Sequence, residues 1–139
     1  MAKKGSPRKA RKAENGKSPR GYEQPGEESL LPPPLGWRVT LGRFVDEIKR
    51  VYGRRLQSVV LYGSRARGDA GSGSDVDTLV VLDPLGDFWT EFDRICEVAN
   101  RVSRDASVVL SARPVDAHEL ANGGSPLMMN VRREGKPVS

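Results

Sequence analysis

Hydrophobic positions recur with helical spacing from residue 37 onward. Up to residue 53, apolar side chains return every three or four positions, and charged side chains take the positions between them. The apolar set is Leu41, Phe44, Val45, Ile48, Val51 and Tyr52. Gly53 interrupts the periodicity, as glycine commonly does after the last turn of a helix. The pattern predicts an amphipathic helix packed on a core.

Short apolar runs, rich in β-branched residues and bounded by turn residues, follow this helix. They cover residues 58–62, 76–82 and 107–110, and each predicts a strand that is largely buried. A second helical stripe lies between the last two runs, over residues 88–102. Its apolar positions are Phe88, Trp89, Phe92, Ile95, Cys96, Ala99 and Val102.

The last part of the chain predicts two more helices. One is short and runs from after Pro114 through Leu120, and the other covers residues 127–133. The turn-forming run at 122–124, Asn-Gly-Gly, separates them. The order of elements predicts one α/β (α+β) domain over residues 37–139, with a three- to four-stranded mixed sheet flanked by helices.

Residues 1–36 have a different composition. Eleven of the 36 are Pro or Gly, and branched aliphatic residues are nearly absent. Such a segment buries too little apolar area to offset its ordering entropy, so we expect a disordered extension. Its first 20 residues carry a net charge of +7, more than the +5 of the whole chain. Such an arm can touch nucleic acid, but we favour a solvated extension over that role.

Composition narrows the class of protein further. No apolar run approaches the roughly 20 residues that span a bilayer, so we expect a soluble, cytoplasmic protein without membrane contact. The chain has one cysteine, Cys96, and one histidine, His118. These numbers exclude an internal disulfide framework and a metal site built from several histidines.

Candidate chemistry lies in the small-residue loop 63–74 and at the start of the next strand. Gly63 follows a buried strand directly, which permits a tight turn where backbone amides and the Ser64 hydroxyl approach phosphate oxygens. Arg65 and Arg67 stand where they could form charge-assisted hydrogen bonds to a polyphosphate.

Asp75 and Asp77 share one face of the following strand, because side chains two positions apart point the same way. Two neighbouring carboxylates repel unless a positive charge lies between them, and oxygen ligands favour Mg²⁺ or Mn²⁺. The alternative is a solvated strand start in which acidic residues protect a sheet edge.

The motif Gly63-Ser64, ten residues, then Asp75-Val76-Asp77 resembles the signature of the DNA polymerase β-like nucleotidyltransferase superfamily. Over about residues 39–136 the chain looks like the minimal nucleotidyltransferases, which often act as antitoxins paired with a HEPN-domain toxin. The resemblance implies a small polymerase β-like fold. It also implies that Gly63 and Ser64 hold the phosphates of ATP.

In this family carboxylates bind two Mg²⁺ ions that bridge the triphosphate, a role that the resemblance gives to Asp75 and Asp77. A third carboxylate from a neighbouring strand normally completes the site and activates the attacking hydroxyl. Our candidate is Asp105, before the predicted strand 107–110.

The resemblance and the small size of the domain favour transfer of AMP to a hydroxyl of a partner protein. The partner would be a HEPN-type toxin, in a homo- or hetero-oligomer that presents the acceptor. Two alternatives stay open. One is an antitoxin that binds without catalysis, and the other is a nucleotidyltransferase for a small molecule or a nucleic-acid end.

Overall fold

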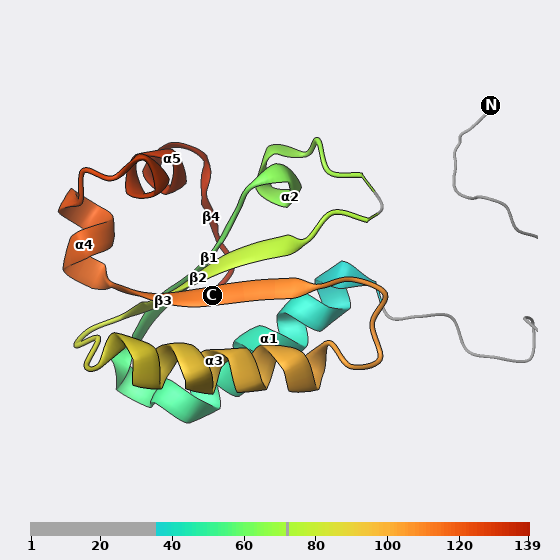
Figure 1. Ribbon diagram of the computed structural model, residues 1–139, viewed down its shortest axis with the longest axis horizontal. Coiled ribbons are helices and arrows are strands. Elements are labelled where there is room, and N and C mark those ends of the chain that lie inside the picture. Colours follow the sequence, from blue (N-terminus) through green and yellow to red (C-terminus); the bar gives the residue numbers. More distant parts are fainter. Residues whose placement is uncertain (1–35, 72) are drawn as a thin grey trace, which may run out of the picture. The chain divides into compact units, whose positions relative to one another are not determined.

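The computed structural model describes residues 36–71 and 73–139 (Figure 1). The prediction for the N-terminal extension lies outside these residues, except at Gly36. The elements are α1 (Trp37–Tyr52), the 3₁₀ turn η3 (Gly53–Arg55), β1 (Leu56–Tyr62), α2 (Ser64–Arg67), β2 (Val76–Leu82), α3 (Phe88–Val102), β3 (Leu110–Asp116), α4 (Ala117–Asn122), α5 (Pro126–Glu134) and β4 (Lys136–Pro137). None of the helices in the described part of the chain is long and apolar enough to span a membrane.

The four strands form one mixed sheet in the order β3-β2-β1-β4. Strand β1 is antiparallel to both of its neighbours, and β2 is parallel to β3. Helices α1 and α3 cover one face, while α4 and α5 lie on the other (Figure 1). The fold class predicted from the sequence, with a sheet of three to four strands, is confirmed. The residues of the short strand β4 were not predicted.

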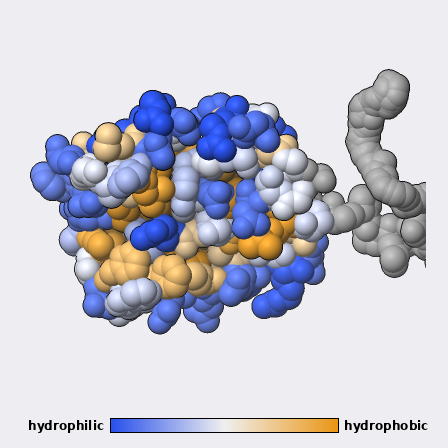
Figure 2. Space-filling view, turned by 45° about the horizontal axis from the view of Figure 1, so that its top comes forward, coloured by the Kyte–Doolittle hydropathy of each residue, from blue (hydrophilic) through white to orange (hydrophobic). Residues whose placement is uncertain are grey.

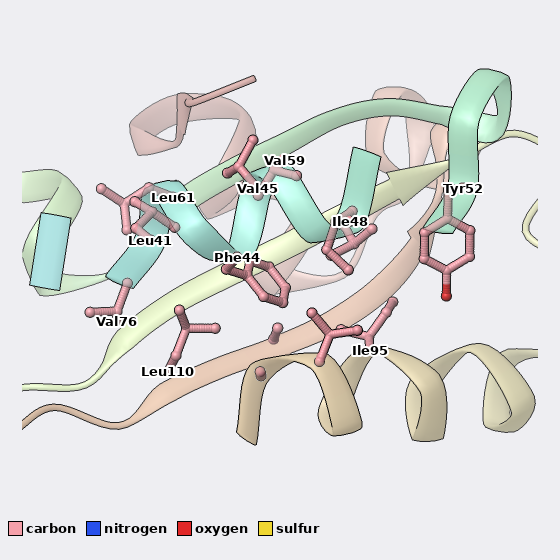
Figure 3. Packing of buried hydrophobic residues seen from close by; sticks show 14 of the residues in the cluster. Leu41, Phe44, Val45, Ile48, Tyr52, Val59, Leu61, Val76, Ile95 and Leu110 are labelled. Carbon is pink, nitrogen blue, oxygen red and sulfur yellow. The ribbon is translucent and has the colours of Figure 1, made fainter. Parts of the chain in front are cut away.

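The main core lies between the sheet and the pair α1 and α3 (Figure 3). Phe44 and Ile48 of α1 are fully buried, and they face Val59 of β1 and Ile95 of α3. The periodicity of α1 is confirmed with one exception. Val51, in the last turn of the helix, is 40% exposed.

Helix α3 is rotated relative to the predicted stripe. Its buried positions are Glu91, Ile95, Val98 and Ala99. Trp89, which the stripe placed in the core, is 67% exposed. The sequence pattern missed this rotation because a charged residue, Glu91, takes a core position.

Hydrogen bonds explain how Glu91 is accommodated in the core. Its carboxylate accepts from the Tyr52 hydroxyl at 2.7 Å and from Arg55 at 3.1 Å, and Arg94 lies at 3.3 Å. Burial by itself would raise the pKa of Glu91, but these hydrogen bonds and positive charges outweigh it and lower the pKa. The network joins α1, η3 and α3 at one end of the core.

The third strand lies further along the chain than predicted. The apolar run at 107–110 predicted a strand there, but β3 begins at Leu110 and continues to Asp116. Val109 in the apolar run is 62% exposed. The observed strand alternates buried and exposed residues at its start, as a strand does when one face packs on the core and the other faces solvent. It is also the edge strand of the sheet. Pro114 fits such a strand, since an edge position needs no donor on its outer side.

We predict that Tyr52→Phe lowers the free energy of unfolding by about 1 kcal/mol at neutral pH, because Glu91 loses a buried donor. Urea denaturation measures the change.

The control Arg50→Ala breaks an exposed 2.7 Å ion pair with Glu47 and should lower the free energy of unfolding by less than about 0.5 kcal/mol. Because the folded pKa of Glu91 is lowered, its contribution is complete above about pH 5 and is lost as the pH falls through the folded value. Equal effects of Tyr52→Phe and Arg50→Ala at pH 7 would contradict this account.

Candidate active site

A tight turn after β1 brings Gly63 against the side chain of Asp77. The antiparallel register of β1 and β2 pairs Tyr62 with Asp77, so the turn begins beside this carboxylate. Gly63 has φ = +78°, and a β-carbon at this position would lie 2.6 Å from Asp77 Oδ2. Both its backbone conformation and its surroundings therefore require glycine. Helix α2 starts at the next residue, Ser64.

Asp75 and Asp77 form a pair of carboxylates at the start of β2. Asp77 is half-buried and Asp75 is exposed. Burial raises the pKa of Asp77, and the negative charge of Asp75 raises it further. In the described part of the chain, neither carboxylate forms an ion pair with Lys or Arg. Two carboxylates without a compensating cation fit a hard divalent ion such as Mg²⁺.

The structure does not bring Asp105 to this pair. Asp105 lies in the turn after α3 and lines a hollow with Arg43 and Arg101, whereas Asp75 lines a different one. The residue that neighbours Asp77 on β3 is Ser111. Within residues 36–71 and 73–139, no three His, Cys, Asp or Glu side chains come together as a metal site. The expected position of Asp105 followed from the misplaced third strand, so its role as a metal ligand rests on the sequence resemblance alone.

Arg65 holds the loop rather than facing the carboxylates. Its guanidinium donates to the carbonyl oxygen of Ser74 at 2.8 Å and lies 5.1 Å from the centre of the Trp37 ring. Burial lowers the pKa of Arg65, and the positive charge of Arg38 lowers it further. Arg65 therefore ties the end of the loop before β2 to α2, which supports the position of Asp75.

Arg67 is exposed and links α2 to the C-terminal helix. It forms an ion pair with Asp69 at 3.2 Å and a longer one with Glu134 of α5 at 3.5 Å. These contacts raise the pKa of Arg67, with the hydrogen bond to Asp69 as the main cause. The predicted binding of phosphate by Arg65 and Arg67 has no support in these contacts and stays a prediction.

Three residues around the site were not singled out from the sequence. Tyr62, Ser111 and Arg113 line the same cleft as Asp75, which has a volume of about 690 Å³. Burial raises the pKa of Tyr62, the charge of Asp77 adds to this effect, and Arg113 opposes it. Ser111 and Arg113 come to the site through the parallel register, which sets them opposite Asp77 and Leu79 of β2, and a hydrophobic pattern does not report that register.

Sequence comparison agrees with this geometry. The family model of the nucleotidyltransferase domain matches residues 41–121, which include the Gly63 turn and both aspartates. The chain belongs to the nucleotidyltransferase domain family. It is a nucleotidyltransferase, and its curated relatives include two archaeal proteins from Methanocaldococcus jannaschii. "Putative protein adenylyltransferase MJ0604" is 34% identical over 79 residues, which are 57% of this chain and 72% of the relative. "Putative protein adenylyltransferase MJ0141" is 32% identical over 68 residues, which are 49% of this chain and 68% of that relative.

Solved structures with a similar fold share little sequence with this nucleotidyltransferase. One, described as a toxin-antitoxin with AMP-PNP, is 20% identical with a TM-score of 0.48, over 69% of this chain and 70% of that one. Another, described as a putative nucleotidyltransferase from Sulfolobus solfataricus, is 20% identical with a TM-score of 0.46, over 71% of this chain and 76% of that one. The family assignment therefore rests on the sequence match.

We predict that Asp75→Asn lowers the pKa of Asp77, because the substitution removes a neighbouring negative charge that raises it. Titration of the Asp77 carboxyl carbon by NMR measures the shift. The control Asp83→Asn changes an exposed aspartate at the far end of β2 and should leave the Asp77 titration unchanged. An Asp77 titration curve that is identical with and without Asp75 would show that the two groups do not interact.

We also predict opposite effects of alanine at two glycines. Gly63→Ala should destabilise the fold by about 1 kcal/mol or more, because of the positive φ, and displace Asp77. It should also weaken binding of Mn²⁺, measured by calorimetry. Gly42→Ala lies in α1 with open space around the added carbon and should stabilise the fold by about 0.5–1 kcal/mol. Unchanged Mn²⁺ affinity in a folded Gly63→Ala variant would contradict the role of this turn.

Proposed function

We propose that this nucleotidyltransferase transfers AMP from ATP to a hydroxyl group of a partner protein. The observation that carries the proposal is the contact between the Gly63 turn and Asp77. It places a glycine turn, which can approach phosphates closely, against a pair of carboxylates that can hold a metal ion. The two archaeal relatives named as protein adenylyltransferases support AMP as the transferred group and protein as the acceptor.

Each residue at the turn has a role in this proposal. The backbone amides of the turn that starts at Gly63 would donate to phosphate oxygens, together with the hydroxyl of Ser64. Asp75 and Asp77 are the residues that would hold Mg²⁺. When bound, the metal supplies charge neutralisation of the triphosphate during transfer. Arg65 positions the loop that precedes Asp75 by its hydrogen bond to Ser74.

The reaction balances without a redox partner. The acceptor hydroxyl oxygen attacks the α-phosphorus of ATP, and a new oxygen–phosphorus bond forms. The bond between the α-phosphorus and the oxygen that bridges to the β-phosphate breaks, and pyrophosphate leaves. The hydroxyl proton passes to solvent. The product is a phosphodiester that joins AMP to the acceptor side chain.

A HEPN-type toxin is the proposed acceptor, as the resemblance of the motif to minimal nucleotidyltransferases implies. The small size of the domain favours an acceptor hydroxyl that belongs to a second protein. In this proposal residues 37–139 form the nucleotide site and leave little additional surface to enclose an acceptor. Modification of a toxin hydroxyl would silence the toxin. In this proposal the chain acts as an antitoxin by catalysis.

One observation favours a second candidate, an antitoxin that binds nucleotide and its partner without turnover. No third carboxylate joins Asp75 and Asp77 in the described part of the chain. A site with two carboxylates can hold a metal–nucleotide complex, but it lacks the acid that usually activates the acceptor in this family. The two candidates differ in whether label from ATP reaches a protein.

A transfer assay tests the proposal. The purified chain is incubated with ATP labelled at the α-phosphate, Mg²⁺ and lysate of the organism that produces it. We predict a labelled protein band with the wild type, and a loss of about 100-fold or more with Asp77→Asn, because this variant removes one of the two metal ligands. Asp105→Asn is the matched control, and we expect it to retain activity because Asp105 lies away from the pair.

The other outcomes separate the candidates. Label found in nucleic acid or in a small molecule would contradict a protein acceptor. It would favour the alternative of a nucleotidyltransferase for a small molecule or a nucleic-acid end. No label with a folded protein that binds ATP would favour the binding antitoxin. Loss of label with Asp105→Asn as large as with Asp77→Asn would restore Asp105 as the third acid.

A further inference from the structure

The cleft that contains Asp75 continues as a groove between β3 and α3. It is lined on one side by Val109 and the first half of β3, residues 110–113, and on the other by one face of α3. The residues from α3 are Phe88, Trp89, Phe92, Cys96, Ala99 and Asn100. Because β3 is the edge strand of the sheet, the groove exposes a strand edge beside the candidate active site.

Backbone groups of β3 point into this groove. Val76 donates its amide to the carbonyl oxygen of Val109 at 2.9 Å. In a parallel pair with this register, alternate residues bond to the neighbouring strand, so Ser111 also bonds to β2. The N–H and C=O groups of Leu110 and Ala112 therefore point away from β2, toward the open edge. Pro114 occupies the next outward position and ends the row of donors.

The apolar side of the groove is formed by aromatic rings already in contact. The rings of Phe88 and Trp89 lie 5.0 Å apart, and those of Trp89 and Phe92 lie 5.6 Å apart. Trp89 and Val109 are 67% and 62% exposed. Figure 2 shows, for one face of the molecule, that apolar surface gathers in patches between hydrophilic regions. Because α3 is rotated relative to the stripe predicted from the sequence, the aromatic face that includes Trp89 lies outside the core, beside the edge of β3.

One cation lies within the groove. The guanidinium carbon of Arg113 is 6.0 Å from the centre of the Phe88 ring. Among the ion pairs of residues 36–71 and 73–139, none includes Arg113. A ligand with an acidic side chain opposite Arg113 would satisfy this charge.

We propose that the groove binds an extended segment of the acceptor protein as an additional strand along β3. Five residues of strand cover about 17 Å, so a segment of five to seven residues fits the stretch from Val109 to Arg113. The segment would bond to Leu110 and Ala112, pack on Trp89 and place an acidic residue at Arg113. Its hydroxyl residue would then lie at the end of the groove beside Asp75. This inference rests on the proposed function and names the form in which the acceptor binds.

Strand addition gives a reason for the location of the groove. Main-chain hydrogen bonds hold an extended peptide without requiring a specific sequence, while side-chain pockets select it. Because Asp75 lines the groove, one side chain of an added strand would lie beside this carboxylate. The outward N–H groups of Leu110 and Ala112 are followed by Pro114, which has no N–H group, and this limits the length of peptide strand that can pair with β3.

Selection from displayed libraries of random heptapeptides, with a hydroxyl residue fixed at one end or the other, tests the proposal. The expected binders carry alternating apolar residues and one acidic residue. Binding of the enriched peptides is then measured by fluorescence anisotropy with wild type and variants. We expect Val109→Lys to weaken binding about 10-fold. Val39→Lys changes an exposed valine on α1, outside the groove, and should have less than about a twofold effect.

Amide hydrogen exchange distinguishes strand pairing from simple apolar contact, because only strand pairing adds hydrogen bonds to the outward amides of β3. Peptide binding should slow exchange at the amides of Leu110 and Ala112, because both become donors to the added strand. Ala112→Pro removes one of these donors and, if circular dichroism shows it folded, should weaken binding as Val109→Lys does. If the Ala112→Pro variant is unfolded, the affinity of Val109→Lys for the peptides and the hydrogen-exchange data on the wild type test the proposal instead.

The proposal is overturned if no peptide is enriched, if enriched peptides bind Val109→Lys as tightly as the wild type, or if protection falls outside Leu110 and Ala112. A dimer of this chain that Val109→Lys dissociates in sedimentation would assign the edge to a second copy and also overturn it. Labelling of a partner that survives both groove variants removes this inference but keeps the proposed function. Peptides that bind the groove in a chain that labels no protein remove the proposed function but support the strand site.

Discussion

The close approach of Gly63 to Asp77 is the constraint on which the candidate site depends. Antiparallel pairing of β1 with β2 puts the end of one strand beside the start of the next, and the turn at Gly63 then passes directly over the Asp77 carboxylate. A side chain at position 63 would occupy the space of that carboxylate. The loop that follows is held by Arg65, whose hydrogen bond to Ser74 fixes the approach to Asp75. The arrangement of the candidate site therefore depends on the backbone geometry of residues 63–77.

The other half of the architecture follows from how α3 packs. Glu91 takes a core position because Tyr52 and Arg55 donate to it, and this contact turns the helix so that Trp89 faces solvent. The aromatic face left outside lies beside β3, which has a free edge. The buried, hydrogen-bonded carboxylate of Glu91 at one end of the core thus shapes a groove that Asp75 also lines.

The sequence predicted the parts of the site that are local. The turn glycine and the aspartate pair belong to consecutive strands, so their spacing is enough to place them together. Asp105 required the position of β3, and the apolar residues before Leu110 indicated a strand where the chain has an exposed connection. Arg113 and Ser111 emerge only from the parallel register with β2. Long-range pairing and the burial of a charged residue such as Glu91 lie outside what a hydrophobic pattern can report.

The most direct test of the central claim is where a metal–nucleotide complex binds. Mn²⁺ with a non-hydrolysable ATP analogue broadens the NMR signals of nearby nuclei. The account predicts that the strongest broadening falls on the amides of Gly63, Ser64 and Asp77, and extends to Ser111 on β3. Strongest broadening around Asp105, or no selective broadening at any concentration that saturates the protein, would contradict a site built from the Gly63 turn and its two aspartates.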